Sequence, residues 1–213
     1  MRIGILGGTF DPPHMAHLVL ASEAHFQLAL DRVLWVLTPD PPHKPGWAIS
    51  PPPARVAMVQ AAIAGEPAFE LSRVDIDRPP PHYASDSLRL LKSQYPQAEL
   101  VYLIGSDSLR DLPNWHRPAE LVAACQSVGV MRRPNANFDL TRLEAQVPGL
   151  KARLRFVDAP LLEISASDIR LRIVEGRPIR YMVPDGVWRL IYELGLYSGK
   201  SLIQGESLRY DSK

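Results

Sequence analysis

The chain has 213 residues, one cysteine and a formal net charge of +1 at pH 7. This length suits one full hydrophobic core, and the near-neutral charge argues against a nucleic-acid partner or an anionic membrane surface, so any anion must be recognised locally. The single cysteine excludes an internal disulfide framework and a cysteine-based zinc site, and no apolar run approaches the roughly 20 residues that span a bilayer. A strand rather than a secretory signal opens the sequence, so we expect a cytoplasmic protein with no membrane partner.

Apolar runs alternate with helical patterns along the chain. We expect strands at 2–6, 32–37, 68–74, 99–105, 127–131 and 153–157, and helices near 14–28, 53–64, 84–94, 118–124, 139–147, 167–175 and 184–195. This alternation predicts an α/β fold with a doubly wound, Rossmann-like parallel sheet, helices on both faces and a small helical C-terminal part. Residues 1–197 are expected to form a single domain, and the polar residues 198–213 a disordered tail.

A glycine-rich turn follows the first predicted strand and precedes a helix, with the sequence GGTFDPPHMAH at 7–17. Glycines let backbone amides approach an anion, and a helix N-terminus adds partial positive charge. His14 and His17 are three residues apart, so they share one face of the opening turns. Such a pair can also decorate the surface, cap the helix or hold a metal, although metal ligation needs a third ligand. The pattern favours a phosphate site with two imidazole donors.

The chain holds 21 prolines, and they cluster at 39–53 and 79–81, after the second and third predicted strands. Proline cannot donate to a sheet ladder, so these segments are stiff loops at the carboxyl ends of strands, where ligands bind in such sheets. Stabilisation of the loops against unfolding explains the prolines equally well. It does not explain His43 and Lys44 in the middle of the first loop.

A second anion-binding pattern lies near residues 163–170. Ser165 begins a predicted helix, where its hydroxyl caps free amides, and Arg170 adds a charged donor one turn along. By itself this is also the pattern of a simple helix cap. Trp115 lies in a polar stretch, which favours a loop and a ligand contact over a place in the core.

These segments resemble signatures of the nucleotidyltransferase superfamily. Residues 8–17 resemble GTFDPxHxxH, with Ala16 where glycine is usual, and residues 164–170 resemble ISSTxIR, with Ala166 and Ser167 in place of Ser-Thr. The pattern at 105–115 resembles the GxDxxxxxxxW of nicotinate mononucleotide adenylyltransferases, and PPHK at 41–44 and YMVP at 181–184 match two further family segments. The resemblance covers essentially residues 1–197.

The resemblance implies transfer of the adenylyl group of ATP to nicotinate mononucleotide, forming nicotinate adenine dinucleotide and pyrophosphate. It assigns catalysis to His14, His17, Lys44 and Arg170. ATP binding falls to Gly7, Gly8, Thr9, Phe10, His14, His17, Gly105, Asp107, Ile164, Ser165, Ser167 and Arg170. Binding of the acceptor nucleotide falls to Asp11, Lys44, Tyr83, Ala84, Asp86, Trp115, His116 and Arg133.

We expect direct transfer, because no covalent nucleophile is evident. Cys125 lies in an apolar run and is expected in the core. Magnesium would arrive with ATP and need few or no protein ligands. Asp11 could orient water or Lys44, but the sequence assigns it no single role.

The segment expected to hold the pyridine substituent of the acceptor differs from the family pattern. Residues 82–88, HYASDSL, depart from the family's SYTxDTL, and Ala84 lacks a hydroxyl that could contact a carboxylate. Nicotinamide mononucleotide, or both nucleotides, therefore stay open as acceptors. More distant alternatives are phosphopantetheine adenylyltransferase and a non-catalytic nucleotide-binding protein. The expected partners are small molecules, and a homo-oligomer is left open.

Overall fold

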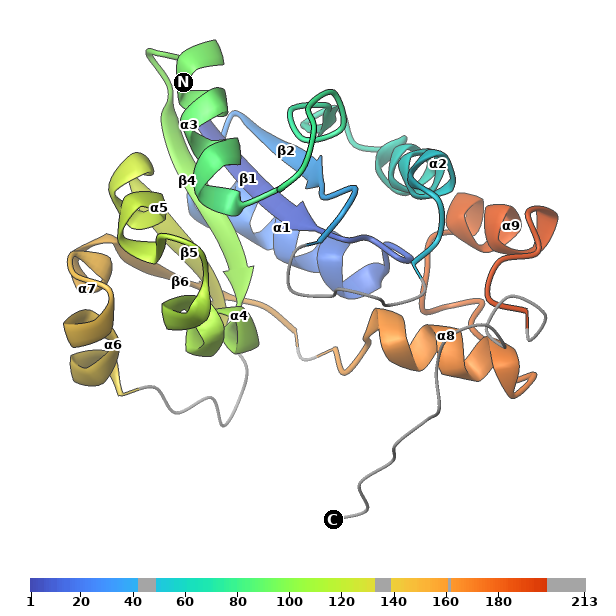
Figure 1. Ribbon diagram of the computed structural model, residues 1–213. Coiled ribbons are helices and arrows are strands. Elements are labelled where there is room, and N and C mark those ends of the chain that lie inside the picture. Colours follow the sequence, from blue (N-terminus) through green and yellow to red (C-terminus); the bar gives the residue numbers. More distant parts are fainter. Residues whose placement is uncertain (42–48, 133–138, 161, 199–213) are drawn as a thin grey trace.

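A computed structural model describes residues 1–41, 49–132, 139–160 and 162–198 of the chain (Figure 1). Within them, strands β1 (Arg2–Gly8), β2 (Arg32–Leu37), β3 (Phe69–Ser72), β4 (Glu99–Gly105), β5 (Ser127–Arg132) and β6 (Leu154–Asp158) form one sheet. Every pairing is parallel and the spatial order is β3-β2-β1-β4-β5-β6. This is the order of a Rossmann-type sheet, in which ligands bind at the carboxyl ends of the strands beside the point where the order reverses. That point lies between β1 and β4.

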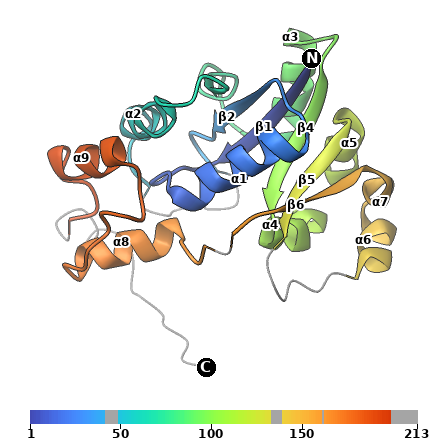
Figure 2. The same cartoon turned by 180° about the vertical axis from the view of Figure 1, so that it is seen from behind.

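Helices cover both faces of the sheet. The helices of the described residues are α1 (Met15–Gln27), α2 (Pro52–Ile63), α3 (Ala84–Gln94), α4 (Ser106–Asp111), the 3-10 turn η1 (Leu112–Asn114), α5 (Pro118–Ala124), α6 (Leu140–Gln146), α7 (Leu150–Arg153), α8 (Ala166–Val174) and α9 (Asp185–Glu193). Figure 2 shows α1 in front of β1, on the face opposite α3 and α5.

The alternation of side chains along the strands divides the core into two layers. Ile3 and Ile5 of β1 pack with leucines of α3, α5 and α7, whereas Leu6 packs with α1 and α2. Gly129 lies on the α1 side of the sheet, where an added Cβ would be 2.8 Å from Leu103 and 2.9 Å from Leu28. The missing side chain lets the end of α1 approach the sheet closely.

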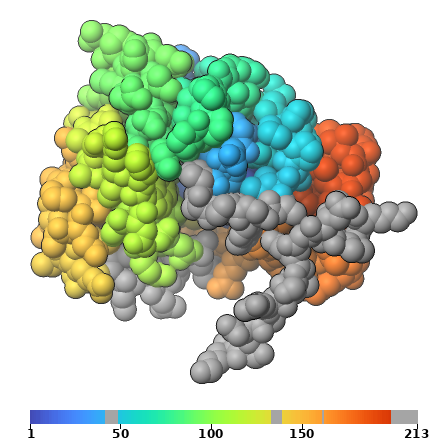
Figure 3. Space-filling model, viewed as in Figure 1, coloured from blue at the N-terminus to red at the C-terminus, as the bar shows by residue number. Residues whose placement is uncertain are grey.

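The C-terminal part forms a third apolar cluster. Ile169 of α8, Val187 and Ile191 of α9 and Tyr197 pack with Met58 of α2. The approach of α9 to α2 is close, because an added Cβ at Gly186 would be 3.1 Å from the Cβ of Ala61. Figure 3 shows the red α9 directly beside the cyan α2. The C-terminal helices therefore pack against α2 rather than against the sheet.

The predicted fold is confirmed, including the parallel sheet and the small helical C-terminal part. All six predicted strands are present within two residues of their expected ends, but α4, η1 and α7 were not predicted. The single domain over 1–197 stays a prediction, and residues 199–213 of the predicted tail lie outside the described part of the chain. Among the described residues, no helix has the length and apolar character needed to cross a membrane.

Candidate active site

The glycine-rich turn leaves the carboxyl end of β1 as predicted, but its strained residue is not a glycine. Phe10 has a φ of 49° and its ring is buried against Trp35, with the ring centroids 5.2 Å apart. Gly8 makes room for that ring, since an added Cβ would be 3.0 Å from it. An added Cβ at Gly7 would be 3.0 Å from the Tyr102 hydroxyl. The side chain of Phe10 thus belongs to the core, and its predicted contact with ATP stays a prediction.

The predicted histidine pair opens α1. His14 is the N-cap residue, and its ring stacks on His17 with centroids 3.7 Å apart. The backbone N–H of His14 donates to Nδ1 of His17 at 3.2 Å. Because Nδ1 accepts this bond, the neutral His17 ring carries its proton on Nε2, where it can donate to a ligand.

The charge of His17 is also determined by its surroundings. Phe10, with its ring centroid 5.2 Å away, lies edge-on to the His17 ring. Burial, and then the neighbouring His14, hold the pKa of His17 well below its usual value of 6.5. At neutral pH the ring is therefore an uncharged N–H donor in the free protein.

The second predicted motif meets the first in space. Ser165 caps α8 by accepting from the backbone N–H of Asp168 at 3.1 Å, as expected. Nη1 of Arg170 donates to the main-chain oxygen of Asp11 at 2.8 Å, across 159 residues of sequence. Nη2 of the same side chain lies 3.3 Å from the Ser167 hydroxyl. The fold thus brings Arg170 to the turn that precedes the histidine pair.

Asp11 is buried, and other parts of the protein occupy its carboxylate. Oδ1 accepts from the Tyr197 hydroxyl at 2.6 Å, and Oδ2 accepts from the backbone N–H of Ser50 at 3.1 Å. The sequence linked Asp11 to the acceptor nucleotide or to Lys44. In the structure it connects the turn after β1 with the start of α2 and with the end of the C-terminal part.

A buried arginine supports the same turn. Arg55 of α2 is 1% exposed and donates to four main-chain oxygens, those of Thr9, Thr38, Pro39 and Ser50, at 2.6–3.0 Å. Burial lowers the pKa of Arg55, and the nearby Asp11 carboxylate opposes that shift. The guanidinium therefore ties the turn after β1 to the segment after β2.

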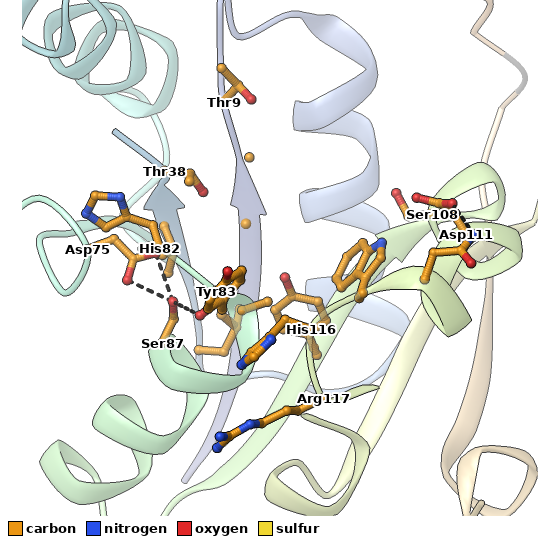
Figure 4. Close-up of a pocket in the computed structure, with 18 residues that line it drawn as sticks. Thr9, Thr38, Asp75, His82, Tyr83, Ser87, Ser108, Asp111, His116 and Arg117 are labelled. Carbon is orange, nitrogen blue, oxygen red and sulfur yellow. Dashed lines mark hydrogen bonds between the residues drawn. The ribbon is translucent and has the colours of Figure 1, made fainter. Parts of the chain in front are cut away.

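A cavity of about 810 Å³ opens at the carboxyl ends of the central strands (Figure 4). Its lining includes these residues predicted to bind nucleotides: Gly7, Gly8, Thr9, Tyr83, Ala84, Trp115 and His116. Tyr83 and His116 stack with centroids 3.9 Å apart, and Trp115 meets Tyr102 edge-on at 6.2 Å. The cavity thus brings the start of α3 and the segment after η1 to the glycine turn, with aromatic rings in its walls.

The lining also includes polar residues that the sequence did not identify. Asp75 is buried, accepts from the Ser87 hydroxyl at 2.8 Å and forms an ion pair with Arg78 at 2.9 Å. Arg78 donates further to the main-chain oxygen of Pro81 at 2.6 Å. In Figure 4, Asp75, His82 and Ser87 lie together beside Tyr83. The sequence could have indicated Asp75 through its position shortly after β3, because ligands bind at the carboxyl ends of the strands in sheets of this kind.

Other predicted residues lie outside this cavity. Gly105 ends β4 and caps α4, and Asp107 is exposed and pairs with Arg110 at 3.7 Å. Asp86 pairs with Arg89 at 3.2 Å, and Ile164 packs on the C-terminal cluster. Lys44 and Arg133 lie outside the described residues.

Nucleophilic or metal chemistry would depend on the thiol or on clustered acidic and histidine side chains. Cys125 is 1% exposed, which confirms its predicted place in the core, and burial raises its pKa to about 11. A protonated, buried thiol is a poor nucleophile at neutral pH. Across the described ranges, no three histidine, cysteine, aspartate or glutamate side chains are grouped so that they could hold a metal ion.

Comparison with solved structures supports the fold. A Plasmodium falciparum nicotinic acid mononucleotide adenylyltransferase complexed with NaAD superimposes with a TM-score of 0.75 at 20% identity, covering 92% of this chain and 97% of that one. The same enzyme complexed with APC gives a TM-score of 0.72 at 19% identity, covering 92% and 96%.

Sequence comparison gives the family. A profile described as cytidylyltransferase-like matches residues 5–172. A relative in Thermomicrobium roseum is 48% identical over 92% of this chain and 91% of its own length, and one in Roseiflexus castenholzii is 45% identical over 92% and 98%. Both carry the name probable nicotinate-nucleotide adenylyltransferase. The chain belongs to the cytidylyltransferase-like family and, within it, groups with the nicotinate-nucleotide adenylyltransferases.

Proposed function

We propose that this chain transfers the adenylyl group of ATP to nicotinate mononucleotide, forming nicotinate adenine dinucleotide and pyrophosphate in NAD biosynthesis. The observation that carries the proposal is the convergence of His14, His17 and Arg170 on one turn at the carboxyl end of β1. That turn also lines an aromatic-walled cavity large enough for a nucleotide. The names of the relatives agree with this activity.

ATP would bind across the helix N-termini at this edge of the sheet. The backbone amides of Gly7–Thr9 and of the first turns of α1 and α8 suit phosphate oxygens. His14 and His17 would donate to the same phosphates, and Arg170 would add a full positive charge. Gly105 and Asp107, at the end of β4, are proposed for the adenosine.

The reaction we propose is a direct in-line transfer. An oxygen of the acceptor's 5′-phosphate attacks the α-phosphorus of ATP and forms a new P–O bond. The bond between the α-phosphorus and the oxygen that bridges to the β-phosphate breaks, and pyrophosphate leaves with the electron pair. The acceptor phosphate is already ionised at neutral pH, so no general base is needed. The protein orients the reactants and stabilises developing charge. Lys44, outside the described residues, is proposed to help with the leaving group.

Magnesium is proposed as the cation that accompanies ATP. Bound to phosphate oxygens and water, it would neutralise charge on the triphosphate. Asp75 is engaged by Ser87 and Arg78, so we assign it no metal. We propose that the reaction takes place in the cytoplasm, with small molecules as the partners.

The acceptor's pyridine ring would lie among the aromatic side chains of the cavity. Trp115 and the stacked Tyr83 and His116 offer flat faces for it. The N-terminus of α3, at Ala84, supplies amides and a partial positive charge that suit a carboxylate. These features favour the acid. Ala84 lacks a hydroxyl that could contact the carboxylate of the acid, so nicotinamide mononucleotide is the second candidate acceptor.

Comparison of acceptors tests the function. Purified protein with ATP and Mg²⁺ should release pyrophosphate with nicotinate mononucleotide, at a kcat/KM at least about tenfold above that for nicotinamide mononucleotide, because one charge-assisted contact contributes on that order. Equal values would overturn the preference for the acid. If neither nucleotide yields pyrophosphate, the proposed activity is wrong, and phosphopantetheine serves as the third substrate to try.

The histidine pair should contribute mainly to the chemical step. His17→Ala is expected to lower kcat about 100-fold, the scale of one lost donor to developing charge. The control is His25→Ala, since His25 lies in the last turn of the same helix. A folded His17→Ala variant with the turnover of the control would contradict this role.

The lowered pKa of His17 also predicts how stability depends on pH. The unfolded chain protonates this ring near pH 6.5, whereas the folded protein resists protonation to a lower pH. Stability should therefore fall as pH drops below about 6.5, by up to about 1.4 kcal/mol per pH unit from this one group. Urea unfolding at pH 7.5 and 5.0 checks this prediction: His17→Gln should lose less stability between the two than the wild type. Equal losses would show that the ring titrates normally.

A further inference from the structure

The C-terminal part of the chain contacts the histidine turn on both sides. The backbone N–H of Met15, the first residue of α1, donates to the main-chain oxygen of Met182 at 3.0 Å. Three residues before His14, the carboxylate of Asp11 accepts from the Tyr197 hydroxyl at 2.6 Å. His14 therefore lies between two residues that are each bound to the segment 182–197.

The bond between Tyr197 and Asp11 lies in a buried and charged setting. Tyr197 is 5% exposed and Asp11 4% exposed, so water does not compete effectively for either group. Burial, and then the Asp11 carboxylate, raise the pKa of Tyr197 far above its usual value of 10.0. The hydroxyl consequently keeps its proton and remains a donor across the physiological range. Ser50, Arg170 and Arg55 are further polar neighbours.

The backbone is unusual at both ends of this bond. Tyr197 has a φ of 62°, and Phe10, directly before Asp11, has a φ of 49°. Left-handed conformations are disfavoured for residues with a side chain, and they persist where the surrounding structure holds them. The ring of Tyr197 is held in the cluster of α2, α8 and α9, which aims its hydroxyl at Asp11.

We propose that Tyr197 is a positioning residue for adenylyl transfer, acting through Asp11. This inference rests on the proposed function. The Asp11 carboxylate accepts a hydrogen bond from the Tyr197 hydroxyl, and the main-chain oxygen of Asp11 accepts one from Arg170. Asp11 therefore connects the turn after β1 with α8 and with the segment that follows α9. The bond fixes the turn that leads into α1, where His14 is the N-cap and His17 lies in the first helical turn. The segment that follows α9 is thus part of the active-site assembly, although Tyr197 is not among the residues that line the cavity.

Tyr197→Phe tests the proposal, because it removes the hydroxyl and keeps the ring. We expect kcat to fall about tenfold, with KM for ATP and for the acceptor nearly unchanged, since misplacement of a catalytic group affects the transition state most. The matched control is Tyr192→Phe, which removes a hydroxyl from a half-exposed tyrosine on α9 and should keep full kcat. A Tyr197→Phe variant with the kcat of the control would overturn the proposal.

A double-mutant cycle tests whether the Tyr197 hydroxyl acts through the Asp11 carboxylate. Asp11→Asn retains the size of the side chain and should also lower kcat. When Asp11→Asn is already present, adding Tyr197→Phe should lower kcat by less than about a further twofold, because the two residues act through one bond. Effects that multiply independently would show that the Tyr197 hydroxyl does not act through Asp11, and would overturn the proposal. If Tyr197→Phe does not fold, an Asp11→Asn variant with wild-type kcat overturns it equally.

A spectroscopic measurement keeps this inference separate from the proposed function. Imidazole ¹H–¹⁵N signals of His14 and His17 should move in Tyr197→Phe but not in Tyr192→Phe, with His25 as an internal reference. If the signals move but the wild type forms no dinucleotide, the proposed function fails and the connection to Asp11 stands. If the wild type is active and neither the signals nor kcat change in Tyr197→Phe, the inference fails alone.

Discussion

The site depends on one buried guanidinium. Arg55 donates to main-chain oxygens of the turn after β1, of the segment after β2 and of Ser50, which precedes the N-cap of α2. A carbonyl left without a donor at this depth would cost about 1–3 kcal/mol. Lysine could not replace it, because only arginine presents five donors in a fixed planar fork. Segments that would otherwise spread at the sheet edge are thereby held together, and the glycine turn reaches the start of α1 in a defined orientation.

The fixed orientation of the glycine turn determines where the side chains that can donate to phosphate lie. With the turn fixed, His14 and His17 stack at the first residues of α1, and the neutral His17 ring presents its Nε2 proton. Arg170 of α8 donates to the main-chain oxygen of Asp11, so a full positive charge lies at the turn that precedes the two imidazoles. A chain with a net charge of only +1 therefore concentrates its anion recognition in one place. This division suits phosphoryl chemistry, in which the protein orients the reactants and stabilises charge.

Local sequence was sufficient for much of this structure. Apolar runs identified the strands because parallel strands are buried on both faces, and the Ser165 cap and the histidine spacing are contained within one helical turn. What local sequence could not show depends on contacts between distant residues. Asp11 meets Tyr197 across 186 residues, and nothing in either segment indicates the other. Arg55 lies in a proline-flanked helix whose pattern does not distinguish a buried arginine from a solvated one. Short helices such as α4 and α7 carry too little periodicity to be recognised.

In the proposed reaction the protein orients two phosphates and forms no covalent bond with either. The configuration at the α-phosphorus tests this most directly, using one diastereomer of ATP with sulfur on that phosphorus and nicotinate mononucleotide as the acceptor. A single in-line transfer inverts the configuration, and we predict a product dinucleotide that is wholly inverted. Retention of configuration would require two successive displacements through an adenylylated side chain, and that result would contradict direct transfer.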